Sequence, residues 1–134
     1  MTNYIYYDDR RKGIEQEIIV KPHLDKFFAE ELIHLTEEFS KWDYAGDNKF
    51  IELKSRYNTH DKYSNTMIGK NEIHNASKLT EDVYFVFNYT DGLYYWKYDK
   101  DVELINAIGG RKDRKFNEQK PYYYIPINLL TKIE

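Results

Sequence analysis

The sequence predicts one mixed α/β domain in which helices flank a β-sheet. Three observations support this fold class: apolar residues recur at helical spacing over residues 24–41, residues 49–54 alternate in period two, and Asp91-Gly92 separates two aromatic, β-branched runs. The chain has 134 residues, so one compact domain spanning residues 1–134 is expected.

The N-terminal third is expected to contain a strand and a helix. Residues 17–20 form a β-branched run bounded by Pro22, which predicts a short strand or arm. Residues 24–41 predict an amphipathic helix, because charged residues lie opposite an apolar face. That face collects Leu24, Phe28, Leu32, Leu35 and Phe39.

Residues 42–57 predict a β-hairpin. Residues 45–48 carry turn chemistry, and the strand over residues 49–54 follows them. Alternation in this strand places Glu52 and Lys54 on one face, because side chains two residues apart point the same way.

The remaining elements follow from shorter patterns. Residues 69–79 predict a brief helix, and residues 83–98 predict a second hairpin. A glycine-containing basic loop is expected over residues 109–120, then a strand over 122–127 and a short helical end over 129–133.

Composition excludes several classes of protein. Without cysteine, the chain has no disulfide scaffold, thiol nucleophile or cysteine zinc site, and it fits a reducing compartment. No apolar run approaches the ~20 residues of a membrane span, and residues 1–10 are unlike a signal peptide, so an intracellular, cytoplasmic protein without a membrane segment is expected. The formal net charge of -3 gives no overall attraction to nucleic acid, so the placement of basic residues matters more.

The predicted hairpin brings three chemically active residues together. Asp43 on one strand should lie beside Glu52 and Lys54 on the other. Two carboxylates can hold Mg²⁺ together with water and phosphate oxygens, and the ammonium can act on the attacking water or on the developing charge. The alternative is a solvated strand with a cross-strand ion pair.

Asp43, Glu52 and Lys54, with the helices and strands around them, resemble the core of the PD-(D/E)XK nuclease superfamily over about residues 24–98. The proline that precedes the aspartate in the family motif is replaced by Trp42. The resemblance implies a restriction-endonuclease-like fold of α-β-β-β-α-β type. It also implies a deoxyribonuclease dependent on Mg²⁺ or Mn²⁺, acting in phage or viral DNA processing, recombination or degradation.

The first helix offers a further acidic residue. On a helical wheel of residues 24–41, Glu31 falls inside the apolar stripe, where a carboxylate is costly unless it is paired. Superfamily members are similar in supplying a helical carboxylate to the metal, which implies Glu31 for this role and Glu38 as the second choice. The alternative is a glutamate at the stripe edge that reaches solvent.

Basic residues after the Glu-x-Lys strand are candidates for phosphate contacts, which supply most sequence-independent affinity for DNA. The densest cluster lies in the basic loop, whose alternative reading is an ordinary solvated loop. The nucleic-acid-binding candidates are Arg56, His60, Lys62, Lys70, Arg111, Lys112, Arg114 and Lys115.

Other chemistries lack a signature. The histidines show no close metal-ligand spacing, and there is no Gly-rich phosphate loop or serine nucleophile elbow. The alternative function is a non-catalytic DNA-binding or protein-interaction module with a nuclease-like fold. One active site cuts one strand, so concerted cutting of two strands would require a homodimer.

Overall fold

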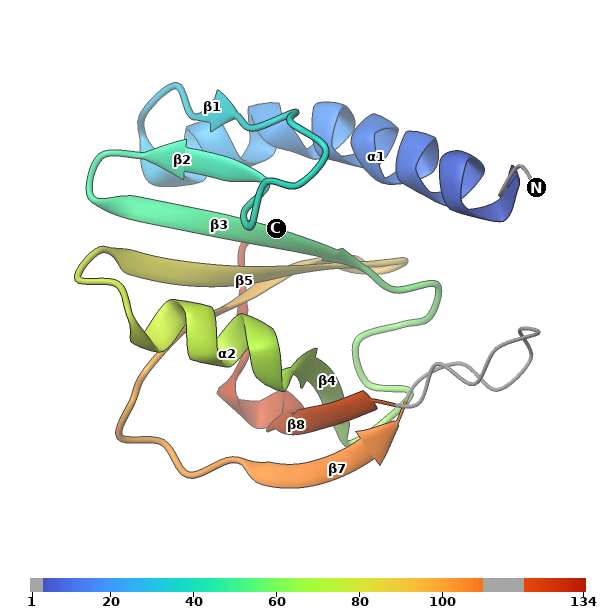
Figure 1. Cartoon of the computed structure of the whole chain (residues 1–134), viewed down its shortest axis with the longest axis vertical. Helices are drawn as coiled ribbons and strands as arrows, with labels where there is room; N and C mark the ends of the chain where they lie inside the picture. The colour runs from blue at the N-terminus through green and yellow to red at the C-terminus, as the bar shows by residue number, and fades with distance from the viewer. Residues whose placement is uncertain (1–3, 110–119) are drawn as a thin grey trace.

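The structure is a computed structural model that describes residues 4–109 and 120–134. Figure 1 shows three layers: helix α1 covers one face of a six-stranded sheet, and helix α2 with a three-stranded sheet lies against the other face. The elements in chain order are α1 (Tyr4–Phe28), β1 (Ile33–His34), β2 (Tyr44–Gly46), β3 (Lys49–Ser55), β4 (Asn65–Gly69), α2 (Lys70–Ser77), β5 (Asp82–Tyr89), β6 (Gly92–Lys97), β7 (Ile105–Gly109), β8 (Lys120–Pro126), the 3-10 turn η1 (Ile127–Leu129) and β9 (Thr131–Lys132).

The large sheet is mixed, which confirms the predicted fold class. Its strand order is β1-β2-β3-β5-β6-β9, and only the central pair β3 and β5 is parallel among its described pairings. The small sheet has the order β4-β8-β7 and is antiparallel. The elements from α1 to β5 follow the expected α-β-β-β-α-β order, with β4 added before α2.

Two apolar clusters fill the spaces between the layers. Strand β5 divides them by alternation, since Val86 packs toward α1 while Phe85 and Phe87 pack toward α2 and the small sheet. The first cluster comprises Val20, Leu24, Leu32, Tyr44, Ile51, Val86 and Leu93. The second comprises Trp42, Ile68, Ala76, Val83, Phe85, Phe87, Tyr89, Tyr94, Trp96 and Ile125.

Helix α1 begins and ends earlier than the sequence predicted. Residues 17–20, expected as a strand, lie inside α1, and the helix expected over residues 24–41 ends at Phe28. Pro22 does not end an element. It lies on the exposed side of α1, where water can satisfy the carbonyl that loses its N–H donor. Ala29 ends the helix with a left-handed φ of 54°.

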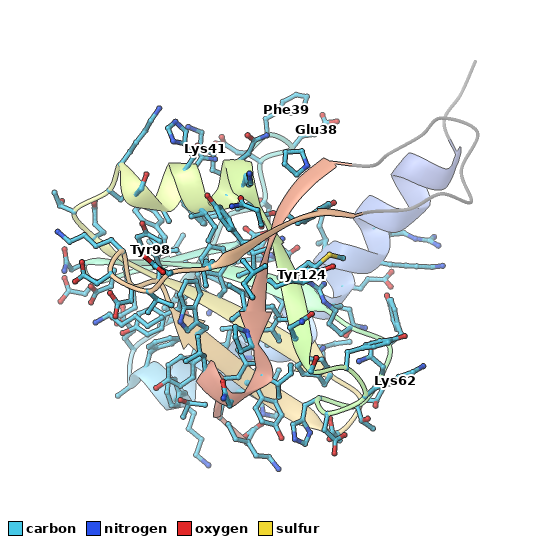
Figure 2. The ribbon with its side chains drawn as sticks, turned by 90° about the horizontal axis from the view of Figure 1, so that it is seen from below. Glu38, Phe39, Lys41, Lys62, Tyr98 and Tyr124 are labelled. Carbon is cyan, nitrogen blue, oxygen red and sulfur yellow. The ribbon has the colours of Figure 1, made fainter. Side chains whose placement is uncertain are left out.

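The apolar residues after Phe28 recur at helical spacing, but they do not form a helix. Leu32 is buried, but the chain reaches it through a reversal in which Asp25 Oδ1 accepts a hydrogen bond from Leu32 N at 2.9 Å. Phe39, expected on the buried stripe, is 87% exposed and lies at the rim of the molecule in Figure 2. The helical prediction therefore fails beyond Phe28.

Both predicted hairpins are confirmed. Strand β2 pairs with β3 and β5 pairs with β6, each antiparallel. Asn48 turns the first hairpin with a φ of 53°, a conformation that asparagine adopts more readily than most residues. Gly92 follows the second turn with a φ of 151°, and a Cβ there would lie 2.7 Å from the Glu134 carbonyl oxygen.

The C-terminal half differs from the prediction in several elements. The expected helix over residues 69–79 is α2, and the expected strand over 122–127 is β8, but β8 lies in a second sheet. The predicted helical end over 129–133 is wrong, because η1 and the short strand β9 occupy this part of the chain. Most of the predicted basic loop lies outside the described residues. Within the described residues, no helix is both long and apolar enough to cross a membrane.

Candidate active site

Strand β3 places Glu52 and Lys54 on one face, as the alternation predicts. They share that face with Phe50, which packs against the second apolar cluster, whereas Ile51 is fully buried toward α1. The side chains of Glu52 and Lys54 are 17% and 16% exposed. Two ionisable groups are thus held at the boundary between the apolar core and solvent.

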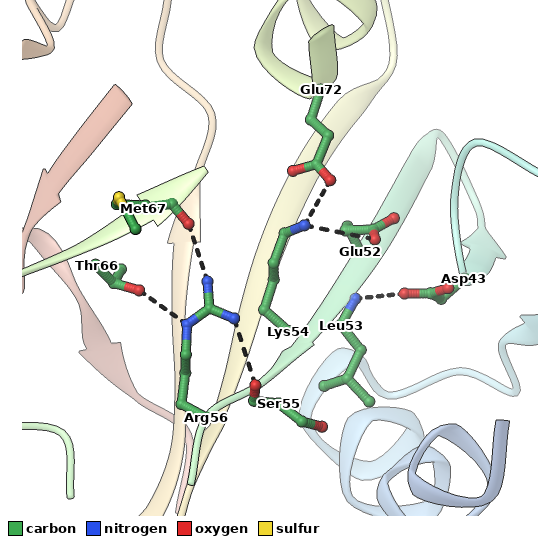
Figure 3. Close-up of polar contacts among 9 residues, drawn as sticks. All are labelled: Asp43, Glu52, Leu53, Lys54, Ser55, Arg56, Thr66, Met67 and Glu72. Carbon is green, nitrogen blue, oxygen red and sulfur yellow. Dashed lines mark hydrogen bonds and ion pairs between the residues drawn. The ribbon is translucent and has the colours of Figure 1, made fainter. Parts of the chain in front are cut away.

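Asp43 precedes β2 and lies alongside this part of β3. Its backbone N–H donates to Ile51 O at 2.9 Å, and its Oδ2 accepts a hydrogen bond from Leu53 N at 2.7 Å. The carboxylate thereby accepts the hydrogen bond of a strand N–H that would otherwise pair with a backbone carbonyl. This tie limits rotation of the Asp43 side chain beside Glu52, as Figure 3 shows.

Lys54 is held by a glutamate that the sequence did not single out. Its Nζ lies 2.5 Å from Glu72 Oε1 and 3.9 Å from Glu52 Oε1 (Figure 3). Glu72 occupies the first turn of α2, where acidic residues are common because they favour the helix dipole. Only the fold, which brings α2 over β3, reveals its pairing with Lys54.

Helix α1 contributes Glu17, rather than Glu31, to the surroundings of Asp43. The charge of Glu17 is among the causes that raise the pKa of Asp43 and of Glu52. Glu17 Oε1 also lies 2.7 Å from His34 Nε2, and both side chains are 14% exposed. Glu31 is exposed and follows the end of α1, so the structure does not bring it to this cluster.

Glu17 could have been found with the correct helix boundaries. It precedes Val20 and Leu24 by three and seven residues, so it lies on the stripe that packs toward the sheet. The same reasoning selected Glu31 only because the helix was predicted too far toward the C-terminus. Glu38, the second choice, lines a cavity of about 180 Å³ together with Glu17 and Asp43.

Burial raises the pKa of the two central carboxyls. Desolvation is the largest cause for Asp43, whose pKa rises to about 7; the charge of Glu17 adds to the rise, and the Leu53 N–H opposes it. Burial also raises the pKa of Glu52 well above its ordinary value, with the charge of Asp43 as the next cause. Ionising both carboxyls is therefore unfavourable unless a cation lies beside them.

The donor set of this cluster fits a hard divalent cation. Mg²⁺ binds through one or two carboxylates and completes its coordination with water and phosphate oxygens. Glu72 Oε2 is buried and has no hydrogen-bond partner among the described residues, a loss of roughly 1–3 kcal/mol or more. A nearby cation or its coordinated water is the kind of partner that such an oxygen lacks.

Arg56, predicted to contact DNA, makes several contacts within the protein. Its Nη2 donates to Met67 O at 2.9 Å and its Nε to Thr66 Oγ1 at 3.2 Å. The guanidinium lies 5.7 Å from the centre of the Phe87 ring, and burial lowers its pKa. These contacts join the end of β3 to β4.

The other predicted nucleic-acid-binding residues are dispersed. Lys62 is exposed near the periphery of Figure 2, and Lys70 lies 5.4 Å from the centre of the Tyr123 ring. Four of them lie outside the described residues: Arg111, Lys112, Arg114 and Lys115.

His60, also predicted to contact DNA, belongs to a second polar cluster. His60, Asp61 and Asp91 offer possible metal-ligand atoms within 4.8 Å of one another. Asp91 accepts hydrogen bonds from His60 N at 2.9 Å and lies 2.5 Å from His60 Nδ1. No sequence spacing predicted this cluster, because Asp91 comes from the turn between β5 and β6, far along the chain from His60. It ties that turn to the segment after β3.

Comparison with known proteins gives one family. A family model described as "Phage putative PDDEXK endonuclease" matches residues 14–133 of the chain. No curated protein and no solved structure gives a significant match. The matched span includes the whole carboxylate cluster and its lysine: Glu17, Asp43, Glu52, Lys54 and Glu72.

Proposed function

This chain belongs to the phage PD-(D/E)XK endonuclease family, and on that premise we propose that it is a divalent-metal-dependent endonuclease that hydrolyses phosphodiester bonds in DNA. One observation carries the proposal: Asp43 and Glu52, two carboxyls with pKa values raised by burial, interact with each other and with the ammonium of Lys54, which lies 3.9 Å from Glu52. This combination suits a metal ion and a reacting phosphate better than it suits a surface ion pair.

Asp43 and Glu52 would hold Mg²⁺ or Mn²⁺, with Glu17 of α1 close enough to influence both. When bound, the ion lowers the pKa of a coordinated water and polarises the scissile phosphate. The Leu53 N–H fixes one oxygen of Asp43, so that this ligand is oriented before substrate arrives.

Lys54 would act on the attacking water or on the charge that develops at phosphorus. Glu72 Oε1 lies 2.5 Å from its ammonium, and Glu52 Oε1 lies 3.9 Å from it. The lysine is therefore oriented by carboxylates from two different elements, α2 and β3. Loss of Lys54 should affect turnover more than metal binding, because both proposed metal ligands remain.

The proposal is tested by nicking of supercoiled plasmid with Mg²⁺, Mn²⁺, Ca²⁺ or EDTA, beside metal titration. Asp43→Asn and Glu52→Gln should abolish nicking and weaken metal binding. Lys54→Met should lower turnover by roughly 10²-fold or more and keep most metal affinity. The matched control is Lys97→Met, which removes a half-exposed lysine of β6 and should nick like the parent.

Two outcomes contradict the proposal in different ways. If the parent and all variants nick alike, the active site lies elsewhere in the chain. If the parent binds DNA but never nicks with any divalent metal, the protein is a non-catalytic DNA-binding member of the family.

A further inference from the structure

A cavity of about 610 Å³ lies directly beside the candidate active site. Lys54 and Glu72 line it, so it adjoins the carboxylate cluster at these two residues. Its other walls come from the segment after β3, from β4, from the end of β5 and from β8. The volume lies within the roughly 300–1,000 Å³ of pockets that take small organic ligands.

The walls of this cavity are rich in aromatic side chains. Tyr122 and Tyr124 both line it because they are two residues apart on β8 and point to the same side. Tyr63, which is 60% exposed, and Tyr89 also line it. Tyrosine rings suit flat ligands, since nucleobases stack on them with little regard to sequence.

The cavity also holds polar groups that lack partners. The buried side-chain atoms without a hydrogen bond among the described residues are the Tyr89 hydroxyl and Glu72 Oε2, and both residues line this cavity. Tyr89 is 5% exposed. The Thr66 hydroxyl is a neighbour of Tyr89, and Thr66 Oγ1 accepts a hydrogen bond from Arg56.

These features define the ligand. It must be flat enough to lie between tyrosines, and it must carry a donor for the Glu72 carboxylate, which only accepts, while the Tyr89 hydroxyl can pair with either a donor or an acceptor. The amides of Asn58 and Asn65, which also line the cavity, add both kinds of group. A phosphate alone fits poorly, because Arg56 is tied to protein oxygens, the Lys54 ammonium is paired with Glu72, and Glu72 would repel an anion.

We propose that this cavity receives one unstacked nucleobase of the DNA strand, from the nucleotide next to the phosphate that is cut. The inference rests on the proposed function, because a phosphate held at the carboxylate cluster tethers its neighbouring nucleotide beside Lys54. A base-binding cavity also sets the substrate class. The enzyme would act where a nucleotide is unpaired or easily extruded, as in a single strand, a flap or a mismatch.

The test combines a filled cavity with a substrate that lacks the base. Asn65→Phe places a bulky side chain on β4 at the cavity wall, and phenylalanine suits a strand. The matched control is Asn106→Phe, an exposed position on β7 outside this cavity. Each protein is assayed on a single-stranded oligonucleotide and on the same strand with an abasic site beside the cut phosphate.

The parent should cleave the abasic strand at least about tenfold more slowly than the intact strand. Asn65→Phe should cleave the intact strand more slowly than the parent by about the same factor. It should cleave the abasic strand as fast as the parent does, because that strand has no base to enter the cavity. Asn106→Phe should match the parent on both. Tyr89→Phe, which removes only the unpartnered hydroxyl, should slow cleavage of the intact strand about fivefold and leave the abasic strand unaffected.

A binding measurement keeps the inference independent of catalysis. With Ca²⁺ in place of Mg²⁺, 2-aminopurine beside the cut phosphate should change its emission on binding to the parent and to Asn106→Phe, but not to Asn65→Phe. Equal cleavage of intact and abasic strands without an emission change would overturn the inference and leave the nuclease assignment standing. Absence of cleavage under all conditions would refute the proposed function, while the emission change would still decide whether a base enters the cavity.

Discussion

Raising the pH should destabilise the metal-free protein because of Asp43. The pKa of this carboxyl rises from 3.8 to about 7 on folding, so between these values the folded state keeps a proton that the unfolded state releases. The folded state then binds more protons, and the free energy of unfolding falls as pH rises through this window. At ~1.4 kcal/mol per pH unit, the loss is at most about 4 kcal/mol, and Glu52 acts in the same direction.

Mg²⁺ should reverse this loss, because it binds the ionised carboxylates. At a concentration of about 100 times its Kd, a ligand of the folded state adds about 2.7 kcal/mol. For a chain of this size, that corresponds to a rise in Tm of roughly 10 °C. We expect the rise at pH 8.0 and a much smaller one at pH 5.5, where Asp43 keeps its proton. The measurement is thermal unfolding followed by circular dichroism, with Mg²⁺ or EDTA.

Asp43→Asn isolates the contribution of this carboxyl. The asparagine keeps an oxygen for the Leu53 N–H and cannot ionise, so the variant should be more stable than the parent at pH 8.0 without metal and should show little Mg²⁺ effect. Glu103→Gln, at an exposed position, should behave like the parent. A parent and an Asp43→Asn variant with the same pH profile would refute the argument that burial of Asp43 opposes its ionisation.

Two further predictions separate neighbouring roles. Glu17→Gln removes a charge that raises the pKa of Asp43, so it should flatten the fall in stability between pH 5.5 and 8.0, whereas Glu31→Gln should not; equal effects in the same unfolding experiment would return Glu31 to consideration. Arg56→Met should lower the free energy of unfolding by roughly 2–3 kcal/mol, because it leaves carbonyl and hydroxyl acceptors unpaired, whereas Lys62→Met should change it by less than about 0.5 kcal/mol. Urea denaturation measures the free energy of unfolding of the Arg56 and Lys62 variants. A small decrease for Arg56→Met would favour its predicted role in DNA binding.

The residues proposed for catalysis could be predicted because they are local in sequence. Asp43 directly precedes the first strand of one hairpin, and Glu52 and Lys54 lie on its second strand, so period-two alternation and turn chemistry suffice to place them together. Glu17 was missed for a local reason too: Pro22 was interpreted as the end of a strand, although an exposed proline is tolerated within α1. Glu72 was missed because its contact with Lys54 depends on how α2 packs, which no local pattern encodes.

The same distinction applies to the fold. Both hairpins and α2 were predicted, since turn residues and short periods specify them directly. The parallel pairing of β3 with β5 and the separate sheet β4-β8-β7 were not predicted, because they join segments far apart in the chain. The strands β1 and β9 have two residues each, too few for any periodic signal.

The parallel pairing of β3 and β5 has a consequence for how the protein folds during its synthesis. Residues 56–81 separate the two strands and contain both β4 and α2. Lys54 therefore leaves the ribosome well before Glu72, and β3 gains its central neighbour only when β5 has followed. Closing such a long crossover is slow compared with forming a hairpin, because loop entropy is lost before the strands pair. We expect a nascent chain that ends before β5 to leave the candidate active site unassembled.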